Sequence, residues 1–216
     1  MQEIIKKQYY YNKEPSNAII TANTMIPCVN GYQVNLNESY KKMKKINKFD
    51  QSLLVYDKIK CQKSISNYYD KVIISGNKTK NNISIILNID EEELFDVINK
   101  ILITNNVYGN ILSNKKLDIS NTNYKNIVSY QYNSFTDYCI TKNLQVNKMC
   151  KDRKTHTVLV RNISNLFLIN TKNIIENGII IIYNFNKNNY NELNIVIKYL
   201  KNNNYHLVSI DELIKE

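Results

Sequence analysis

The densest group of potentially reactive side chains in this sequence is an unbroken acidic run, Asp90, Glu91, Glu92 and Glu93. Carboxylates can bind a divalent cation or transfer a proton, and Asp137 could add another. The run also fits the start of a helix, whose positive dipole end favours acidic residues. Asp90 and Glu93 have the spacing of a capping box. We favour the helix start and keep an acidic metal site as an alternative.

The histidines and cysteines show no spacing that is typical of a metal site. The two histidines, His156 and His206, lie far apart in the sequence and are interpreted as structural. No C-x-x-C pair occurs among the four cysteines, which makes a zinc site improbable. Their even number permits disulfides in an exported protein, but free thiols are equally compatible. The four are Cys28, Cys61, Cys139 and Cys150.

The net charge of +10 would favour a polyanionic partner. Arg153 and Arg161 are the only arginines, however, so the chain is poorly equipped for bidentate recognition of phosphates or bases. The densest lysine cluster, within residues 41–45, fits the solvated face of a helix. No nucleic-acid partner is expected, and a basic polyanion-binding protein is the last-ranked alternative.

Apolar runs alternate with helical patterns in a way that predicts an α/β fold of layers or a barrel. The 216 residues suit one self-sufficient core, preceded by an extended arm over the first twenty residues. We expect helices over 37–46, from Asp90, on the face that carries Leu193, and from a cap at Ser209 with Glu212. The expected strands cover residues 53–56, 72–75, 83–87, 107–112, 127–132, 157–160, 166–169, 179–183 and 206–208.

Four pieces of the sequence resemble the NodB-type polysaccharide deacetylases in order and spacing. Residues 83–90, ISIILNID, and 106–112, NVYGNIL, are similar to the family's T-F-D-D-G strand and N-V-K-A-T-F-F strand. Residues 178–184, GIIIIYN, resemble G-x-I-I-L-L-H-D, and residues 200–213 resemble the closing helix and strand. The resemblance implies a distorted (β/α) barrel over residues 83–216, with residues 1–82 as an N-terminal arm and short α/β extension.

The same resemblance implies an activity and a cofactor. Family members remove acetyl groups from N-acetylated sugars with a divalent metal such as zinc, an Asp base, and a second Asp with two His as ligands. In this sequence the base falls on Asn88 and the ligand Asp on Ile89, while Asp90 stands where the family has Gly. The two metal-binding His fall on Tyr130 and Ser134. The loop from Asp90 into the helix is also shorter than in the family.

The last family motif, His-Asp, falls on Tyr183 and Asn184, so the candidate general acid is missing as well. We therefore expect no catalytic residue and no metal, and predict a catalytically inactive deacetylase-like protein. Tyr130, Tyr132 and Tyr183 could stack on sugar rings, although plain packing is the favoured interpretation. An active carbohydrate N-deacetylase with a non-standard site is the alternative.

The resemblance further implies a partner and a location. The expected ligand is a polysaccharide that contains N-acetylglucosamine, such as peptidoglycan, or else a protein. The family pattern places such a protein outside the cell or on its surface, but the N-terminus has no apolar core of a signal peptide. A membrane attachment would require an N-terminal anchor beyond the given sequence.

Overall fold

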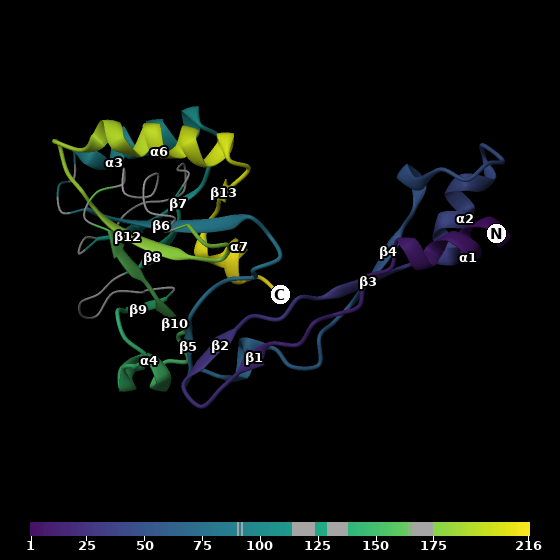
Figure 1. Cartoon of the computed structure of the whole chain (residues 1–216), viewed down its shortest axis with the longest axis horizontal. Helices are drawn as coiled ribbons and strands as arrows, with labels where there is room; N and C mark the ends of the chain where they lie inside the picture. Colours follow the sequence, from purple (N-terminus) through teal and green to yellow (C-terminus); the bar gives the residue numbers. More distant parts are fainter. Residues whose placement is uncertain (90, 92, 114–123, 129–137, 164, 166–174) are drawn as a thin grey trace. The chain divides into compact units, whose positions relative to one another are not determined.

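The computed structural model describes residues 1–216 except residues 90, 92, 114–123, 129–137, 164 and 166–174 (Figure 1). The chain packs as two compact units. Unit 1 comprises Met1–Ala18, Cys28–Ser64 and Glu216, and unit 2 comprises Ile19–Pro27 and Ile65–Lys215. This division differs from the predicted boundary between residues 82 and 83, because residues 19–27 and 65–82 contribute strands to unit 2.

Unit 2 is organised around β6 (Asn82–Ile89), a strand that is buried along almost its whole length. The strand order is β11-β12-β6-β7-β8, every pair is parallel, and β13 also pairs with the start of β6. A continuous apolar run is typical of a strand that is covered on both faces. The partners are β7 (Gly109–Leu112), β8 (Tyr124–Val128), β11 (Arg161–Ile163), β12 (Ile180–Phe185) and β13 (His206–Leu207).

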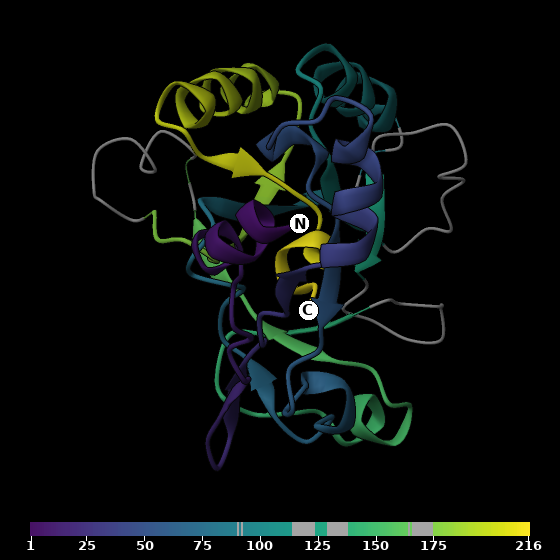
Figure 2. The same cartoon turned by 90° about the vertical axis from the view of Figure 1, so that its right-hand side faces the viewer.

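Two helices, α3 (Leu94–Thr104) and α6 (Tyr190–Asn202), cover one face of this sheet and lie side by side (Figures 1 and 2). The odd-numbered residues of β6 point to them, since side chains alternate along a strand. The main core of unit 2 forms there. From the strands it takes Ile83, Ile85, Leu87, Ile89, Ile111, Ile181, Tyr183 and Phe185, and from the helices Leu94, Phe95, Ile98, Leu102, Leu193, Val196, Ile197 and Leu200.

The opposite face of the sheet is joined to the C-terminal helix α7 (Ile210–Ile214) through a buried asparagine. Asn110, fully buried, donates to Ser84 Oγ at 2.7 Å and to the Ile85 carbonyl at 2.9 Å. Its Oδ1 accepts from the Ile210 backbone N–H at 2.9 Å. The N-cap Ser209 adds a bond from the Glu212 N–H at 3.2 Å, so two side chains satisfy donors that the first helical turn leaves unpaired.

A second sheet of unit 2 has the order β1-β2-β5-β10-β9. A disulfide between Cys139 and Cys150 ties strand β9 to helix α4. Among the described strands, both sheets have unpaired edge strands. The structure therefore shows a mixed α/β unit with open sheets. The elements are β1 (Ile19–Ile20), β2 (Thr24–Ile26), the 3₁₀ turn η3 (Ile65–Asn67), β5 (Val72–Ile73), β9 (Cys139–Thr141), α4 (Lys148–Asp152) and β10 (Thr157–Leu159).

Unit 1 is a small α+β unit built on an antiparallel ribbon with its own core. The core consists of Ile4, Val34, Met43 and Leu54. In the described residues of both units, no helix has the length and apolar character that a membrane crossing requires. The elements of unit 1 are α1 (Gln2–Lys7), the 3₁₀ turn η1 (Gln8–Tyr10), β3 (Gly31–Val34), α2 (Leu36–Lys44), the 3₁₀ turn η2 (Gln51–Leu53) and β4 (Tyr56–Ile59).

Three local expectations were wrong. The first residues form α1 and not an extended arm, because Ile4 is buried and Lys7 pairs with Glu3 at 2.9 Å one turn away. The strand expected at 53–56 begins only at Tyr56, since Asp50 caps the η2 turn through the Ser52 N–H. The helix expected from Asp90 begins at Leu94 with Glu93 at the N-cap, while Asp90, the proposed first residue of a capping box, lies outside the described residues.

Candidate functional site at the strand ends

Two asparagines face each other at the C-terminal ends of the central strands of unit 2. Asn88 of β6 and Asn184 of β12 are directly opposite in the parallel register. The Asn88 Nδ2 donates to Asn184 Oδ1 at 2.8 Å. Asn88 is half-buried and Asn184 is exposed, so the pair lies where the sheet face away from α3 and α6 meets solvent. In parallel α/β proteins ligands bind at this end of the strands.

The turn that follows Asn184 at the end of β12 is held in place by asparagine side chains. Asn189 Nδ2 donates to the Asn184 carbonyl at 2.9 Å, and Asn189 Oδ1 accepts from the Asn186 N–H at 2.8 Å. Such local side-chain bonds to the backbone are how asparagine stabilises turns. The backbone that follows Asn184 is therefore held by side-chain hydrogen bonds.

Ile89 and Tyr183 belong to the opposite face of the sheet. Ile89 and Tyr183 are each only 1% exposed and both lie in the core beneath the helices. The Tyr183 hydroxyl donates to Glu192 Oε2 of α6 at 2.8 Å. Burial, and then the hydrogen bond to the Glu192 carboxylate and its charge, raise the pKa of the Tyr183 phenol. Tyr183 is therefore a packing residue, and the idea that it stacks on a sugar is wrong.

The described part of the acidic run forms ion pairs with a lysine that follows β12. Lys187 Nζ lies 3.1 Å from Glu91 Oε2 and 2.9 Å from Glu93 Oε2. Its hydrogen bond and charge lower the pKa of the Glu93 carboxyl, while Glu93 and Glu91 raise the pKa of Lys187. All three side chains are solvent-exposed. The two described carboxylates are therefore paired with one ammonium group at the surface.

Several residues singled out in the sequence lie outside the described residues, and their roles stay predictions. They are Asp90, Glu92, Tyr130, Tyr132, Ser134 and Asp137. Of the predicted site positions that the structure describes, Asn88 and Asn184 lie in direct contact.

The described strand ends do not fit the zinc that the resemblance to the deacetylases implies. A carboxamide is a weak ligand for a divalent metal, and Ile89 has no donor atom and points beneath the helices. Zinc sites use Cys, His or carboxylate ligands that converge and leave one position open. Asn88 also has no proton-accepting function near neutral pH, so it cannot act as a general base.

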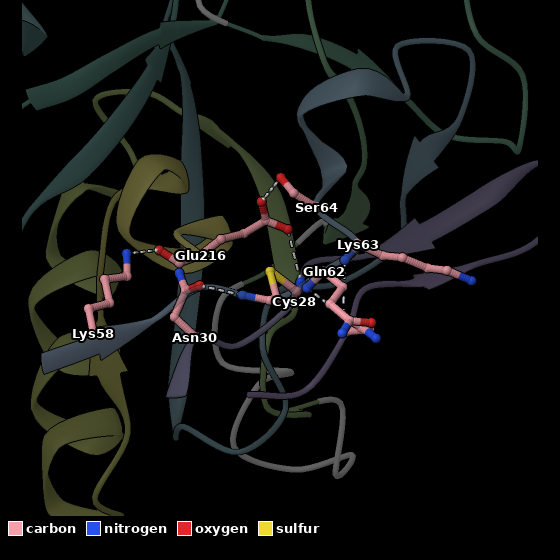
Figure 3. Close-up of a disulfide and its surroundings, with 9 residues drawn as sticks. Cys28, Asn30, Lys58, Gln62, Lys63, Ser64 and Glu216 are labelled. Atoms are coloured by element: carbon pink, nitrogen blue, oxygen red, sulfur yellow. Dashed lines mark hydrogen bonds between the residues drawn. A yellow bond between two sulfur atoms is a disulfide. The ribbon is translucent and has the colours of Figure 1, made fainter. Parts of the chain in front are cut away.

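The one convergence of possible metal ligands among the described residues lies in unit 1, at Cys28, Cys61 and Glu216. Its two sulfur atoms form a disulfide (Figure 3). The Glu216 carboxylate accepts from the Cys28 N–H at 3.0 Å and from the Ser64 hydroxyl. The cluster is therefore a structural clamp. Sequence reasoning left both disulfides open, because spacing alone cannot show which cysteines meet in space.

Comparison with known proteins begins at the level of sequence. No model of a known protein family matches the chain. The uncharacterized protein YlxY of Bacillus subtilis (strain 168) is 34% identical over 89 residues. That segment is 41% of this chain and only 28% of YlxY, so it spans less than a third of the relative's length.

Similarity to solved structures extends over the whole chain. Wild-type BA3943 of Bacillus anthracis, a CE4 family pseudoenzyme, aligns at a TM-score of 0.75 and 19% identity, covering 100% of this chain and 94% of that one. A BA3943 mutant with restored enzymatic activity aligns at 0.77 and 19% identity, covering 100% and 97%. The Bc1960 peptidoglycan N-acetylglucosamine deacetylase aligns at 0.52 and 11%, covering 66% of this chain and 92% of Bc1960. The chain therefore has the fold of the CE4 deacetylases and pseudoenzymes, and the fold relationship predicted from the NodB-type motifs is confirmed.

Proposed function

We propose that this protein is a polysaccharide deacetylase-like pseudoenzyme, with the strands of unit 2 arranged as a distorted (β/α) barrel. The observation that carries the proposal is the Asn88–Asn184 amide pair at the strand ends. The CE4 reaction needs a base and a metal-activated water at that edge. Two amides that bond to each other provide neither.

A site that is unable to hydrolyse can still bind. Within the described residues, Asn88 Oδ1 and Asn184 Nδ2 have no protein partner, which leaves one acceptor and one donor at the rim of the sheet. These groups match an acetamido group, which also offers one donor and one acceptor. The similarity to Bc1960, a peptidoglycan N-acetylglucosamine deacetylase, supports a polysaccharide of this kind as the partner.

The disulfides support a location outside the reducing cytosol. Both pairs, Cys28–Cys61 and Cys139–Cys150, are closed, and disulfides persist mainly in oxidising compartments. We infer an extracellular or cell-surface protein. The alternative of an active deacetylase based on the acidic run is disfavoured by Lys187, which pairs with Glu91 and Glu93.

Equilibrium dialysis against zinc, with the disulfides intact, tests the loss of the metal centre. We expect no stoichiometric zinc on the wild-type chain. The variant Lys187→Ala serves as a second arm, because it frees the two carboxylates without altering the amide pair. Stoichiometric zinc on the wild type, lost on replacing Glu91 and Glu93 together by Gln, would establish an acidic metal site and refute the proposal.

A further inference from the structure

A groove lined by tyrosines lies on unit 1 and has no part in the site at the strand ends. Its volume is about 590 Å³, within the usual range for small-ligand pockets. The lining contains four tyrosines, three amides, one acid, one lysine and one glycine, and no aliphatic side chain. These residues are Tyr10, Tyr11, Asn12, Asn30, Gly31, Tyr32, Gln51, Tyr56, Asp57 and Lys58.

The aromatic wall of the groove is held by ring contacts. Tyr32 of β3 and Tyr56 of β4 pack edge to face, with ring centroids 5.3 Å apart and planes at 79°. Tyr11 stacks on Phe49 at 6.1 Å. Burial, and then the neighbouring Tyr32 and Tyr11, raise the pKa of the Tyr56 phenol, as expected where three hydroxyls gather. Even so, Tyr32 and Tyr56 each remain 41% exposed and Tyr10 is 79% exposed.

The groove is preorganised by the segment that precedes β3. Lys13 and Tyr32 exchange backbone hydrogen bonds of 2.8 Å, so the N-terminal segment runs along β3. A Cβ on Gly31 would lie 2.3 Å from the Lys13 carbonyl oxygen, so glycine is required for this close approach. Asn12 Oδ1 accepts from the Val34 N–H at 2.8 Å. The segment that carries Tyr10 is therefore fixed against the ribbon.

Two residues that line the groove, Asn30 and Lys58, are hydrogen-bonded to the disulfide clamp (Figure 3). Asn30 Oδ1 accepts from the Cys61 N–H at 2.9 Å, and Lys58 Nζ donates to the Glu216 carbonyl at 3.1 Å. The Nδ2 groups of Asn12 and Asn30 have no partner within the described residues. Two amide donors are thus available on a rigid frame, and a rigid site loses less conformational entropy on binding.

The chemistry of the lining selects one ligand class. Asp57 and Lys58 balance each other in charge, so the lining of the groove carries no net charge although the chain is basic. A lining without aliphatic side chains differs from a protein-binding core, which combines aromatic rings with apolar groups such as Met. Exposed aromatic faces with nearby amides suit a molecule that has apolar C–H faces and hydroxyl edges.

We propose that this tyrosine groove is a second binding site, and that its ligand is a neutral oligosaccharide. A sugar face packs against one of the two perpendicular rings of Tyr32 and Tyr56, Tyr10 covers the open side, and the amides of Asn12 and Asn30 donate to hydroxyl or acetamido oxygens. This site is independent of the Asn88–Asn184 pair.

Isothermal titration of the full chain with the β-1,4-linked tetramer of N-acetylglucosamine, and with cellotetraose, tests the proposal. We expect saturable binding of at least one of them, weakened about two- to tenfold by Tyr10→Ala, since an aromatic contact contributes about 0.5–1.5 kcal/mol. Tyr108→Ala is the matched control, because Tyr108 is 43% exposed and does not line the groove. Tyr10 is not in the core, so its replacement should leave the unfolding temperature unchanged.

Each of the other outcomes refutes the proposal that the groove binds sugar. The first such outcome is that neither oligosaccharide binds. Equal affinities of the Tyr10→Ala, Tyr108→Ala and wild-type chains would place the binding elsewhere. Loss of binding in Asn88→Ala alone would assign the sugar to the strand ends, which supports the binding role proposed above and not the groove. Self-association that Tyr10→Ala abolishes, without sugar binding, would assign the groove to a protein contact.

Discussion

Replacement of Asn110 by alanine should destabilise unit 2 strongly, because this buried amide joins β6, β7 and α7. It makes three hydrogen bonds, and the Ile210 N–H that it caps is itself buried. Ser84 Oγ keeps its bond to the Val208 carbonyl, so the main loss is one orphaned N–H, at about 1–3 kcal/mol, plus a small cavity. We expect a total of about 3 kcal/mol, or a fall of roughly 6–12 °C in the unfolding temperature.

Urea unfolding followed by circular dichroism measures this loss. The matched control is Asn202→Ala, since Asn202 is an exposed residue at the end of α6 and should change stability by less than about 0.5 kcal/mol. A loss below about 1 kcal/mol in Asn110→Ala would refute the argument that this amide anchors α7.

Three further changes test other parts of the structure. Tyr183→Phe should cost about 1–2 kcal/mol at neutral pH through the lost bond to Glu192. Because the phenol pKa is raised in the folded protein, this contribution is present below pH 10 and falls as the pH rises beyond 10. The difference in unfolding free energy between the two proteins, measured with urea, should therefore shrink above pH 10. A constant difference would contradict this. Gly178→Ala should cost about 2 kcal/mol or more, as measured by thermal unfolding, because φ is +84° there; an unchanged melting temperature would contradict this. Joint replacement of Cys28 and Cys61 by serine opens a loop of 33 residues, and in the loop-entropy model it lowers the unfolding free energy by about 3–4 kcal/mol. Reducing agent should then leave the stability of unit 1 in this variant unchanged.

The elements of unit 2 that have strong hydrophobic periodicity could be predicted from the sequence. The apolar run around Leu87 is β6, and the helix that carries Leu193 is α6 with that residue fully buried. The cap at Ser209 forms as its spacing predicts. In these segments local propensity, apolar period and tertiary packing agree, which is the condition under which pattern reasoning succeeds.

Unit 1 was predicted only in part: the helix expected over residues 37–46 is α2, but tertiary contacts decide the rest of the unit. The first helix is stabilised by burial of Ile4, a single apolar contact that no period reveals. The Cys28–Cys61 disulfide joins residues 33 apart. The tyrosine groove is likewise assembled from three separate stretches of chain. The composition shows that tyrosines are abundant, but it cannot show which of them lie together in the fold.

The candidate site was predictable in residue type but not in side-chain direction. The sequence placed Asn88, Ile89, Tyr183 and Asn184 together as altered site positions. Strand alternation separates them, and only the two asparagines point away from the helices. Register between β6 and β12 is a tertiary property, and a shift of one residue would have exchanged the two faces.

The most direct test of the central claim is a measurement of acetate released from N-acetylglucosamine oligomers by the full chain with added zinc. If the chain is a pseudoenzyme with amides at Asn88 and Asn184, it should release no more acetate than buffer with zinc alone. Turnover by the wild-type chain that is lost on Asn88→Ala or Asn184→Ala would contradict the account, because it would show that this pair takes part in a working hydrolase.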